Sequence, residues 1–125
     1  MSRKEITASI TKTIVDAGNI HGRLWRNNQG VATFQKGKYN HTVAYGVGGR
    51  GGADLIGFRR VGKLAQFVAI EIKSAKSDKL TDQQQNFLRV VNLSGGYGAV
   101  ANPETATAVA KDLVDKTNKA VLHYE

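Results

Sequence analysis

Residues 67–73 constrain the fold more than any other segment, because they form an apolar, β-branched run until their last three positions. A run of this kind is typical of a central strand that is covered on both faces of its sheet. Glu71 and Lys73 close the run, and their side chains project to the same face because side chains alternate along a strand. Burying either charge alone is costly, so we expect the two to share a site with a further partner.

Asp54 is the candidate partner. It lies near the start of a predicted strand at residues 53–59, which turns at once into the strand of residues 64–73. An antiparallel hairpin of these strands places Asp54 close to Glu71. Two adjacent carboxylates repel, and a hard cation such as Mg²⁺ neutralises them, with the carbonyl of Ile72 as a further candidate ligand. An ordinary ion pair on an edge strand explains the same pattern equally well.

The remaining elements follow from periodicity and from their caps. Isoleucines at four-residue spacing predict a first helix at residues 3–17, and Trp25 and Phe34 are expected in the core. Residues 27–30 are expected to turn between two short strands, and residues 37–52 to form a mobile, glycine-rich loop. The further predicted elements are strands at 24–26, 31–34, 97–101 and 120–124, a helix at 81–94, and a last helix with Asn102 as N-cap and Pro103 at its first position. This order predicts one α/β domain over residues 1–125, with a mixed sheet flanked by helices.

Charge is the informative part of the composition. Eighteen Lys and Arg against ten Asp and Glu give a net charge of +8. A small basic domain suits a polyanionic partner such as nucleic acid, although a basic surface also serves solubility. The absence of cysteine excludes disulfides, thiolate metal sites and thiol catalysis. With no signal-like or membrane-spanning apolar run, we expect a soluble, intracellular protein.

The predicted loop at residues 37–52 carries basic and aromatic residues. Residues 46–51 match the pattern G-x-G-x-x-G, but a strand rather than a helix follows, so dinucleotide binding is not expected. Either this segment approaches a phosphate backbone through Arg50, or it is an ordinary solvent loop. Tyr39 and Tyr45 are candidates for stacking on bases. The residues predicted to bind nucleic acid are Arg26, Lys36, Lys38, Arg50 and Lys76.

The motifs occur in the order of a known family. Residues 52–57 (GADLIG), 69–74 (AIEIKS) and 79–84 (KLTDQQ) together resemble the VRR-NUC branch of the PD-(D/E)XK nucleases. The resemblance extends upstream to Glu5 and residues 26–30, and downstream to residues 87–88, 95–96 and 100–101. It covers nearly the whole chain, and the ordered set is specific although each motif alone is not. It implies a restriction-endonuclease-like core in the order α-β-β-β-α-β-α.

The resemblance also assigns roles. It implies that Asp54 and Glu71 are metal ligands, that Lys73 is the catalytic lysine, and that Glu5 is a supplementary acidic ligand. Gln84 matches a glutamine near the active site, although with Thr81 it also forms a capping box. Glu5 likewise has an alternative interpretation, because a first-turn acid suits a helix dipole. Two departures from the family pattern are Asp82, where a proline is usual, and Ala53 before the first acid.

The expected activity is Mg²⁺- or Mn²⁺-dependent hydrolysis of DNA phosphodiesters, with Lys73 stabilising charge beside the attacking water. Stand-alone members of the resembled family are small, often viral or prophage-borne, and similar to junction-resolving nucleases that act as homodimers. We therefore expect a homodimeric endonuclease for branched or four-way junction DNA, in the cytoplasm of a bacterium or phage-infected host. The alternatives are a non-catalytic nucleic-acid-binding module, which would have lost a site residue, and a restriction-type enzyme, for which the chain is short.

Overall fold

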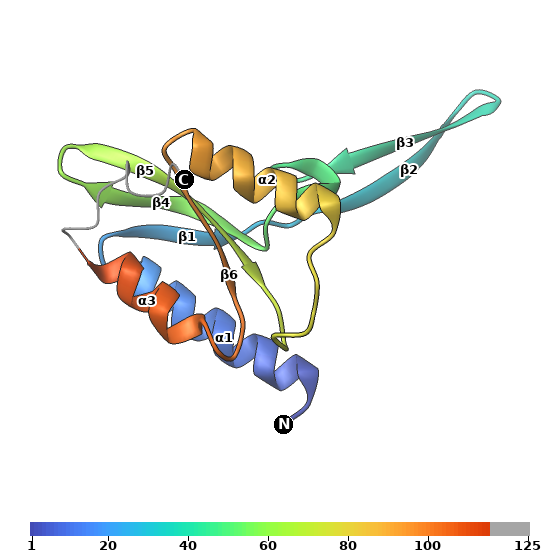
Figure 1. Ribbon diagram of the computed structural model, residues 1–125. Helices are drawn as coiled ribbons and strands as arrows, with labels where there is room; N and C mark the ends of the chain where they lie inside the picture. The colour runs from blue at the N-terminus through green and yellow to red at the C-terminus, as the bar shows by residue number, and fades with distance from the viewer. Residues whose placement is uncertain (116–125) are drawn as a thin grey trace.

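The computed structural model describes residues 1–115, which form a mixed α/β structure (Figure 1). The elements are α1 (Arg3–Gly18), β1 (Gly22–Arg26), β2 (Gly30–Lys36), β3 (Tyr39–Tyr45), the short 3₁₀ helix η1 (Gly49–Gly51), β4 (Leu55–Val61), β5 (Leu64–Ile72), α2 (Asp82–Leu93), β6 (Tyr97–Ala101) and α3 (Ala106–Val114). The strand predicted at residues 120–124 lies outside the described residues. No helix within residues 1–115 has the length and apolarity that crossing a membrane requires.

The central sheet has the strand order β1-β4-β5-β6. The β1/β4 and β4/β5 pairs are antiparallel, whereas β5 and β6 run parallel, so the sheet is mixed as predicted. The segment expected to be a central strand is β5, and Val68 and Ile70 on it have no exposed surface. With β2 and β3 set aside, the chain follows the predicted order α-β-β-β-α-β-α. The predicted fold class is confirmed.

Helices cover both faces of this sheet. Helices α1 and α3 pack on one face through a cluster that includes Ile14, Leu55, Ile70 and Leu113. Helix α2 packs on the other face, where Leu88 and Val91 contact Ala53 and Ala69. Figure 1 shows α2 on one side of the sheet and the α1–α3 pair on the other. The expected apolar stripes of the three helices are therefore the faces that they bury.

Helix α3 begins later than expected. The prediction placed Asn102 as its N-cap and Pro103 at its first position, but the helix starts at Ala106. The Oδ1 atom of Asn102 accepts hydrogen bonds from the backbone N–H groups of Glu104 (2.8 Å) and Thr105 (3.0 Å). This side chain therefore closes a turn over Pro103 and Glu104, as asparagine often does, and the helix follows that turn.

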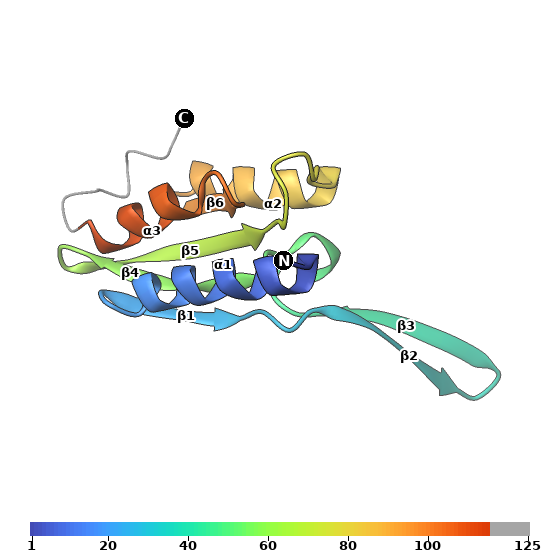
Figure 2. The same ribbon diagram turned by 90° about the horizontal axis from the view of Figure 1, so that it is seen from below.

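The pairing of the strands after α1 also differs from the prediction. Residues 27–30 do not turn between two paired strands, because β1 pairs with β4 and β2 pairs with β3. The stretch predicted to be a mobile loop, residues 37–52, contains β3 and η1. Strands β2 and β3 form a separate hairpin that projects from the body of the protein, which we call the arm (residues 30–45; Figures 1 and 2).

Two aromatic residues expected in the core are exposed. The exposed fraction is 54% for Trp25 and 50% for Phe34. Phe34 lies on the arm, where no other element covers it. Trp25 lies on the edge strand β1, where its ring approaches that of Phe58 at 6.1 Å between centroids. Apolar side chains therefore face solvent on the edge strand β1 and on the arm, and exposed apolar patches of this kind often mark binding surfaces.

Candidate active site

The β4/β5 hairpin brings Asp54 and Glu71 together. Leu55 pairs with Ile70 in the register, so Asp54 and Glu71 occupy the next positions outward and lie on the same face of the sheet. Oδ2 of Asp54 accepts a hydrogen bond from the N–H of Ile72 at 2.8 Å, and its carbonyl accepts one from the N–H of Asn27 at 2.8 Å. The Asp54 carboxylate is therefore held against β5 by the backbone.

Glu71 is a buried ionisable group in this cluster. Only 3% of it is exposed, and its Oε2 atom is buried without a hydrogen-bond partner. Burial raises its pKa to about 8, with a further increase from the neighbouring Asp54 carboxyl and a partly compensating decrease from Lys73. Such a group is stable as an anion only when a cation lies against it.

Lys73 and Gln84 complete the cluster. The Nζ atom of Lys73 donates to Oε1 of Gln84 at 3.4 Å, and Nε2 of Gln84 donates to Oε1 of Glu71 at 3.2 Å. Oε1 of Gln84 also accepts from the N–H of Thr81, and Oγ1 of Thr81 accepts from the N–H of Gln84, so the capping box forms as well. The two interpretations of Gln84 are thus compatible: the cap at the start of α2 places its amide between Glu71 and Lys73.

The donor set fits a hard divalent cation. Two carboxylates that repel each other, one with a buried oxygen lacking a partner, match the low number of protein ligands that Mg²⁺ takes. Within residues 1–115 there is no group of three or more acidic or histidine side chains that could hold a metal. Glu5, predicted as a further ligand, accepts a hydrogen bond from the N–H of Ser2 in the capping box of α1, and its role as a ligand stays a prediction.

A pocket of about 620 Å³ opens over the two carboxylates. Helix α1 contributes Thr7 and Thr11, and the segment after β1 and the end of β3 form the rest of the rim. Its lining residues are Thr7, Thr11, Arg26, Asn27, Asn28, Gln29, Tyr45, Asp54, Leu55, Glu71 and Ile72. The sequence interpretation missed the two threonines. It also assigned the Asn-Asn-Gln-Gly run to a simple turn, although burial of Asn27 shows a structural role.

Asn27 and Gln29 fix the glycine-rich segment 46–52 against this pocket. Asn27 exchanges two hydrogen bonds with the backbone of Val47, donating to its carbonyl at 2.7 Å and accepting from its N–H at 3.0 Å. It also donates to the carbonyl of Ala53, and Gln29 donates to that of Gly52 at 2.7 Å. A Cβ on Gly52 would lie 2.0 Å from the carbonyl oxygen of Val47, so this close approach requires glycine. The segment is packed rather than a free loop.

The basic residues predicted to contact nucleic acid lie in different places. Arg26 lines the pocket over the carboxylates, and Arg50 lines a neighbouring hollow of about 270 Å³ together with Gln84. Lys36 and Lys38 lie at the far end of the arm. Lys76 lies in the turn after β5 and forms an exposed ion pair with Glu104 at 3.3 Å.

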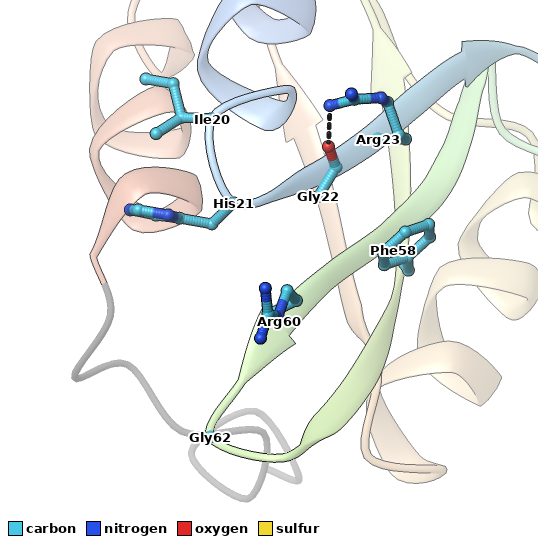
Figure 3. A pocket seen from close by; sticks show the side chains of 7 residues that line it. All are labelled: Ile20, His21, Gly22, Arg23, Phe58, Arg60 and Gly62. Atoms are coloured by element: carbon cyan, nitrogen blue, oxygen red, sulfur yellow. Dashed lines mark hydrogen bonds between the residues drawn. The ribbon is translucent and has the colours of Figure 1, made fainter.

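A larger hollow of about 690 Å³ lies at the opposite end of β1 and β4, away from the carboxylates. Figure 3 shows the side chains of His21, Arg23, Phe58 and Arg60 around it. None of the described residues that line this hollow is acidic, and Arg23 donates a hydrogen bond to the carbonyl of Gly22 at 2.9 Å. Size therefore does not identify the reactive site, whereas the buried carboxylate pair does.

The mixed sheet with helices on both faces is the architecture of the restriction-endonuclease-like class. A family model for the VRR-NUC domain matches residues 15–104, which is most of the chain, and the protein belongs to this family. The family assigns a nuclease function with DNA as the substrate. The match begins after Glu5, so the ligand role predicted for that residue lies outside it. Comparisons with curated proteins and with solved structures found no match.

Proposed function

We propose that the protein is a metal-dependent DNA endonuclease that acts on branched DNA as a homodimer. The observation that carries the proposal is the buried Glu71 carboxylate, which has an oxygen without a partner and lies beside Asp54 at the end of β5. A carboxylate pair of this kind destabilises the folded state unless it binds a cation. A catalytic role therefore explains the two carboxylates better than a structural role does.

Asp54 and Glu71 are the residues that would hold Mg²⁺ or Mn²⁺, with the carbonyl of Ile72 and the carboxylate of Glu5 as further candidate ligands. A cation bound there supplies Lewis acidity toward the scissile phosphate and lowers the pKa of water. Asp54 is oriented by the N–H of Ile72, so its carboxylate needs little rearrangement on binding. Such preorganisation limits the entropic cost of assembling the site.

Lys73 supplies a positive charge that acts on Glu71. Its contact with Gln84 holds the ammonium group on the face that Glu71 occupies. From there it orients the attacking water and stabilises the negative charge that develops on the phosphate. Gln84 acts as a positioning residue, since one amide group contacts both Glu71 and Lys73.

The charge of the chain supports binding of the DNA backbone. A net charge of +8 favours phosphate contacts through counterion release. Arg26 lies at the catalytic pocket and Arg50 in the adjoining hollow, so both are candidates for contacts to phosphates beside the cleaved bond. Lys36, Lys38 and Lys76 are candidates for more distant contacts.

An exposed apolar surface supports the homodimer. Trp25, Phe58 and Phe67 lie on one face of the sheet, and Trp25 and Phe67 are 54% and 40% exposed. Helix α2 packs over the second half of β5 and over β6 on this face, so Trp25 and Phe67 stay exposed and Phe58 is half-buried. A two-fold interface buries such a patch against its own copy. Two catalytic sites would then cut two strands of a junction, in a bacterium or a phage-infected host.

Incubation with linear, flapped and four-way junction DNA tests the proposal. We expect cleavage with Mg²⁺ or Mn²⁺, none with EDTA, and a preference for the branched substrates. Replacement of the central residues, as Asp54→Asn, Glu71→Gln or Lys73→Ala, is expected to lower the rate by at least about 100-fold. Binding without metal-stimulated cleavage would instead identify a non-catalytic binding module.

A further inference from the structure

Within residues 1–115 the two strands of the arm contact each other and, outside the arm, mainly η1 at its base. In strands β2 and β3 every residue is exposed except Gly30, which is half-buried. The strands pair only with each other, and Figure 2 shows them extending away from the sheet. A two-stranded hairpin is marginally stable in water on its own. An arm of this length therefore indicates a surface that contacts a partner.

The two faces of the arm differ in chemistry. Directly paired residues share a face, so the register assigns each side chain. One face carries Val31, Ala44 and the polar pairs Thr33–Thr42 and Gln35–Asn40. The opposite face, which we call the aromatic face, carries Phe34, Lys36, Tyr39, His41, Val43 and Tyr45. On it the rings of Phe34 and His41 stack at 5.4 Å between centroids.

The charge of the arm selects the kind of partner. Residues 30–45 contain two lysines, one histidine and no acidic residue. Two copies of the arm packed against each other would bring like charges together without compensation, which is unfavourable. A polyanion compensates them. Exposed rings beside lysines are the combination with which proteins hold single-stranded nucleic acid, by stacking on bases and contacting phosphates.

The base of the arm is continuous with the catalytic pocket. Tyr45 pairs with Gly30 at the last position of the arm, and it lines the pocket together with Asp54 and Glu71. A Cβ on Gly30 would lie 2.5 Å from the hydroxyl oxygen of Tyr45, so glycine allows this side chain to lie across the strand. The aromatic face therefore begins at the carboxylates and runs outward to Lys36 and Tyr39.

We infer that the aromatic face of the arm binds unpaired bases of the DNA strand that leads into the catalytic pocket. This inference rests on the proposed function and specifies its substrate: DNA with unpaired bases next to the cleaved bond. Seven residues per strand at about 3.4 Å each give a track of roughly 20 Å, with same-face side chains about 7 Å apart. Phe34 and Tyr39 stack on bases, and Lys36 and Lys38 contact the adjoining phosphates.

The arm can stack only on unpaired bases, because stacking requires an accessible base face. Inside a duplex both faces of each base are covered by neighbours, and only phosphates and groove edges remain available to the arm. At a branch point or in a flap the faces are open. The arm therefore distinguishes branched from linear DNA without reading sequence.

The test compares variants of the two faces. The aromatic face is changed in Phe34→Leu/Tyr39→Leu, which keeps apolar bulk and removes the rings. The opposite face is changed at the same distance from the body in Gln35→Ala/Asn40→Ala, which is the matched control. A third variant, Phe34→Tyr/Tyr39→Phe, keeps both rings. Dissociation constants are measured by fluorescence anisotropy in EDTA, with a forked duplex carrying a single-stranded tail and with a linear duplex of equal length.

We expect the leucine variant to bind the forked DNA about 10- to 100-fold more weakly, the range given by loss of one or two base stacks. Its affinity for linear duplex should change less than about threefold, as should both affinities of the control and ring-keeping variants. Equal loss on both DNAs, or no loss on either, overturns the inference. So does a dimer that becomes a monomer in the leucine variant by sedimentation, because the rings then bind a second copy.

Failure of the proposed function gives a different result. If the wild-type protein cleaves no DNA with Mg²⁺ or Mn²⁺ but the leucine variant loses forked DNA selectively, the arm binds as inferred and the catalytic proposal is wrong. If cleavage occurs and the affinities of the leucine variant are unchanged, the catalytic proposal stands and the inference about the arm is wrong.

Discussion

The central sheet and the arm are both built from antiparallel hairpins, yet they are stabilised in opposite ways. Helices cover both faces of the second half of β5, where Val68, Ala69 and Ile70 have no exposed surface. The β2/β3 hairpin has no covering element and is fixed only at its base. The carboxylates of Asp54 and Glu71, which we propose to be catalytic, lie where the two hairpins meet. Burial of β5 therefore holds the carboxylates in place, whereas the exposed arm beside them is free to contact substrate.

The largest expected difference between the two hairpins is in the free energy of unfolding. Ile70→Ala removes a fully buried side chain from β5 and leaves a cavity. We expect it to lower the free energy of unfolding by about 2 to 5 kcal/mol, measured by urea denaturation. A loss below about 1 kcal/mol would show that the core does not depend on this strand as the structure indicates.

Buried Glu71 should make the stability of the metal-free protein depend on pH. Its pKa is about 8 in the folded state and near 4.5 in the unfolded chain. Between these values the folded state binds more protons, so the free energy of unfolding falls as pH rises from about 4.5 to 8. The expected decrease is on the order of a few kcal/mol.

Urea denaturation in EDTA at pH 5 and pH 8 measures this effect, with Glu71→Gln as the comparison. The variant should lose less stability than the wild type over the same range, and Mg²⁺ should restore the wild type most strongly at pH 8. An identical pH profile for both proteins would mean that Glu71 is not the buried group responsible.

The junction between the two hairpins should show an intermediate effect. Asn27 is buried and makes three hydrogen bonds to the backbone of Val47 and Ala53. Asn27→Ala leaves these groups without partners and should lower the free energy of unfolding by about 1 to 3 kcal/mol. Hydrogen exchange of residues 46–52 should become faster. Asn28→Ala, at the exposed neighbouring position, is the control, and equal effects of the two changes would contradict the assigned role of Asn27.

The smallest effect on stability is expected in the arm itself. Phe34 is 50% exposed and contacts no core element, so Phe34→Ala should change the free energy of unfolding by less than about 0.5 kcal/mol. The same urea titration measures it. A loss of 2 kcal/mol or more would mean that the arm packs against the body, and the contrast between the hairpins would not hold.

The sequence predicted those elements of the fold that residues close together along the chain determine. The apolar run of β5 and its short turn from β4 determine the hairpin that places Asp54 beside Glu71. The positions of α1 and α2 followed from apolar spacing, and the Thr81–Gln84 capping box from four residues of sequence. In each case neighbouring residues contain the physical cause.

The unpredicted part depends on contacts between distant segments. The polar, glycine-rich composition of residues 37–52 hid β3, whose partner is β2 rather than the core. Asn27 and Gln29 have the composition of a turn, and only the fold shows that they bind the backbone of residues 47–53. Trp25 belongs to an apolar pattern, but whether a helix covers its face is decided by where α2 packs. The sequence pattern shows which side chains share a face of a strand, whereas tertiary packing decides whether another element covers that face.

The central claim is that Asp54 and Glu71 form the metal centre, and a Mn²⁺ titration followed by electron paramagnetic resonance tests it most directly. The wild type and Glu104→Gln, which alters an exposed acid paired with Lys76, should bind Mn²⁺ equally. Asp54→Asn and Glu71→Gln should each weaken binding by at least about tenfold. Equal Mn²⁺ affinity in all four proteins would contradict the account.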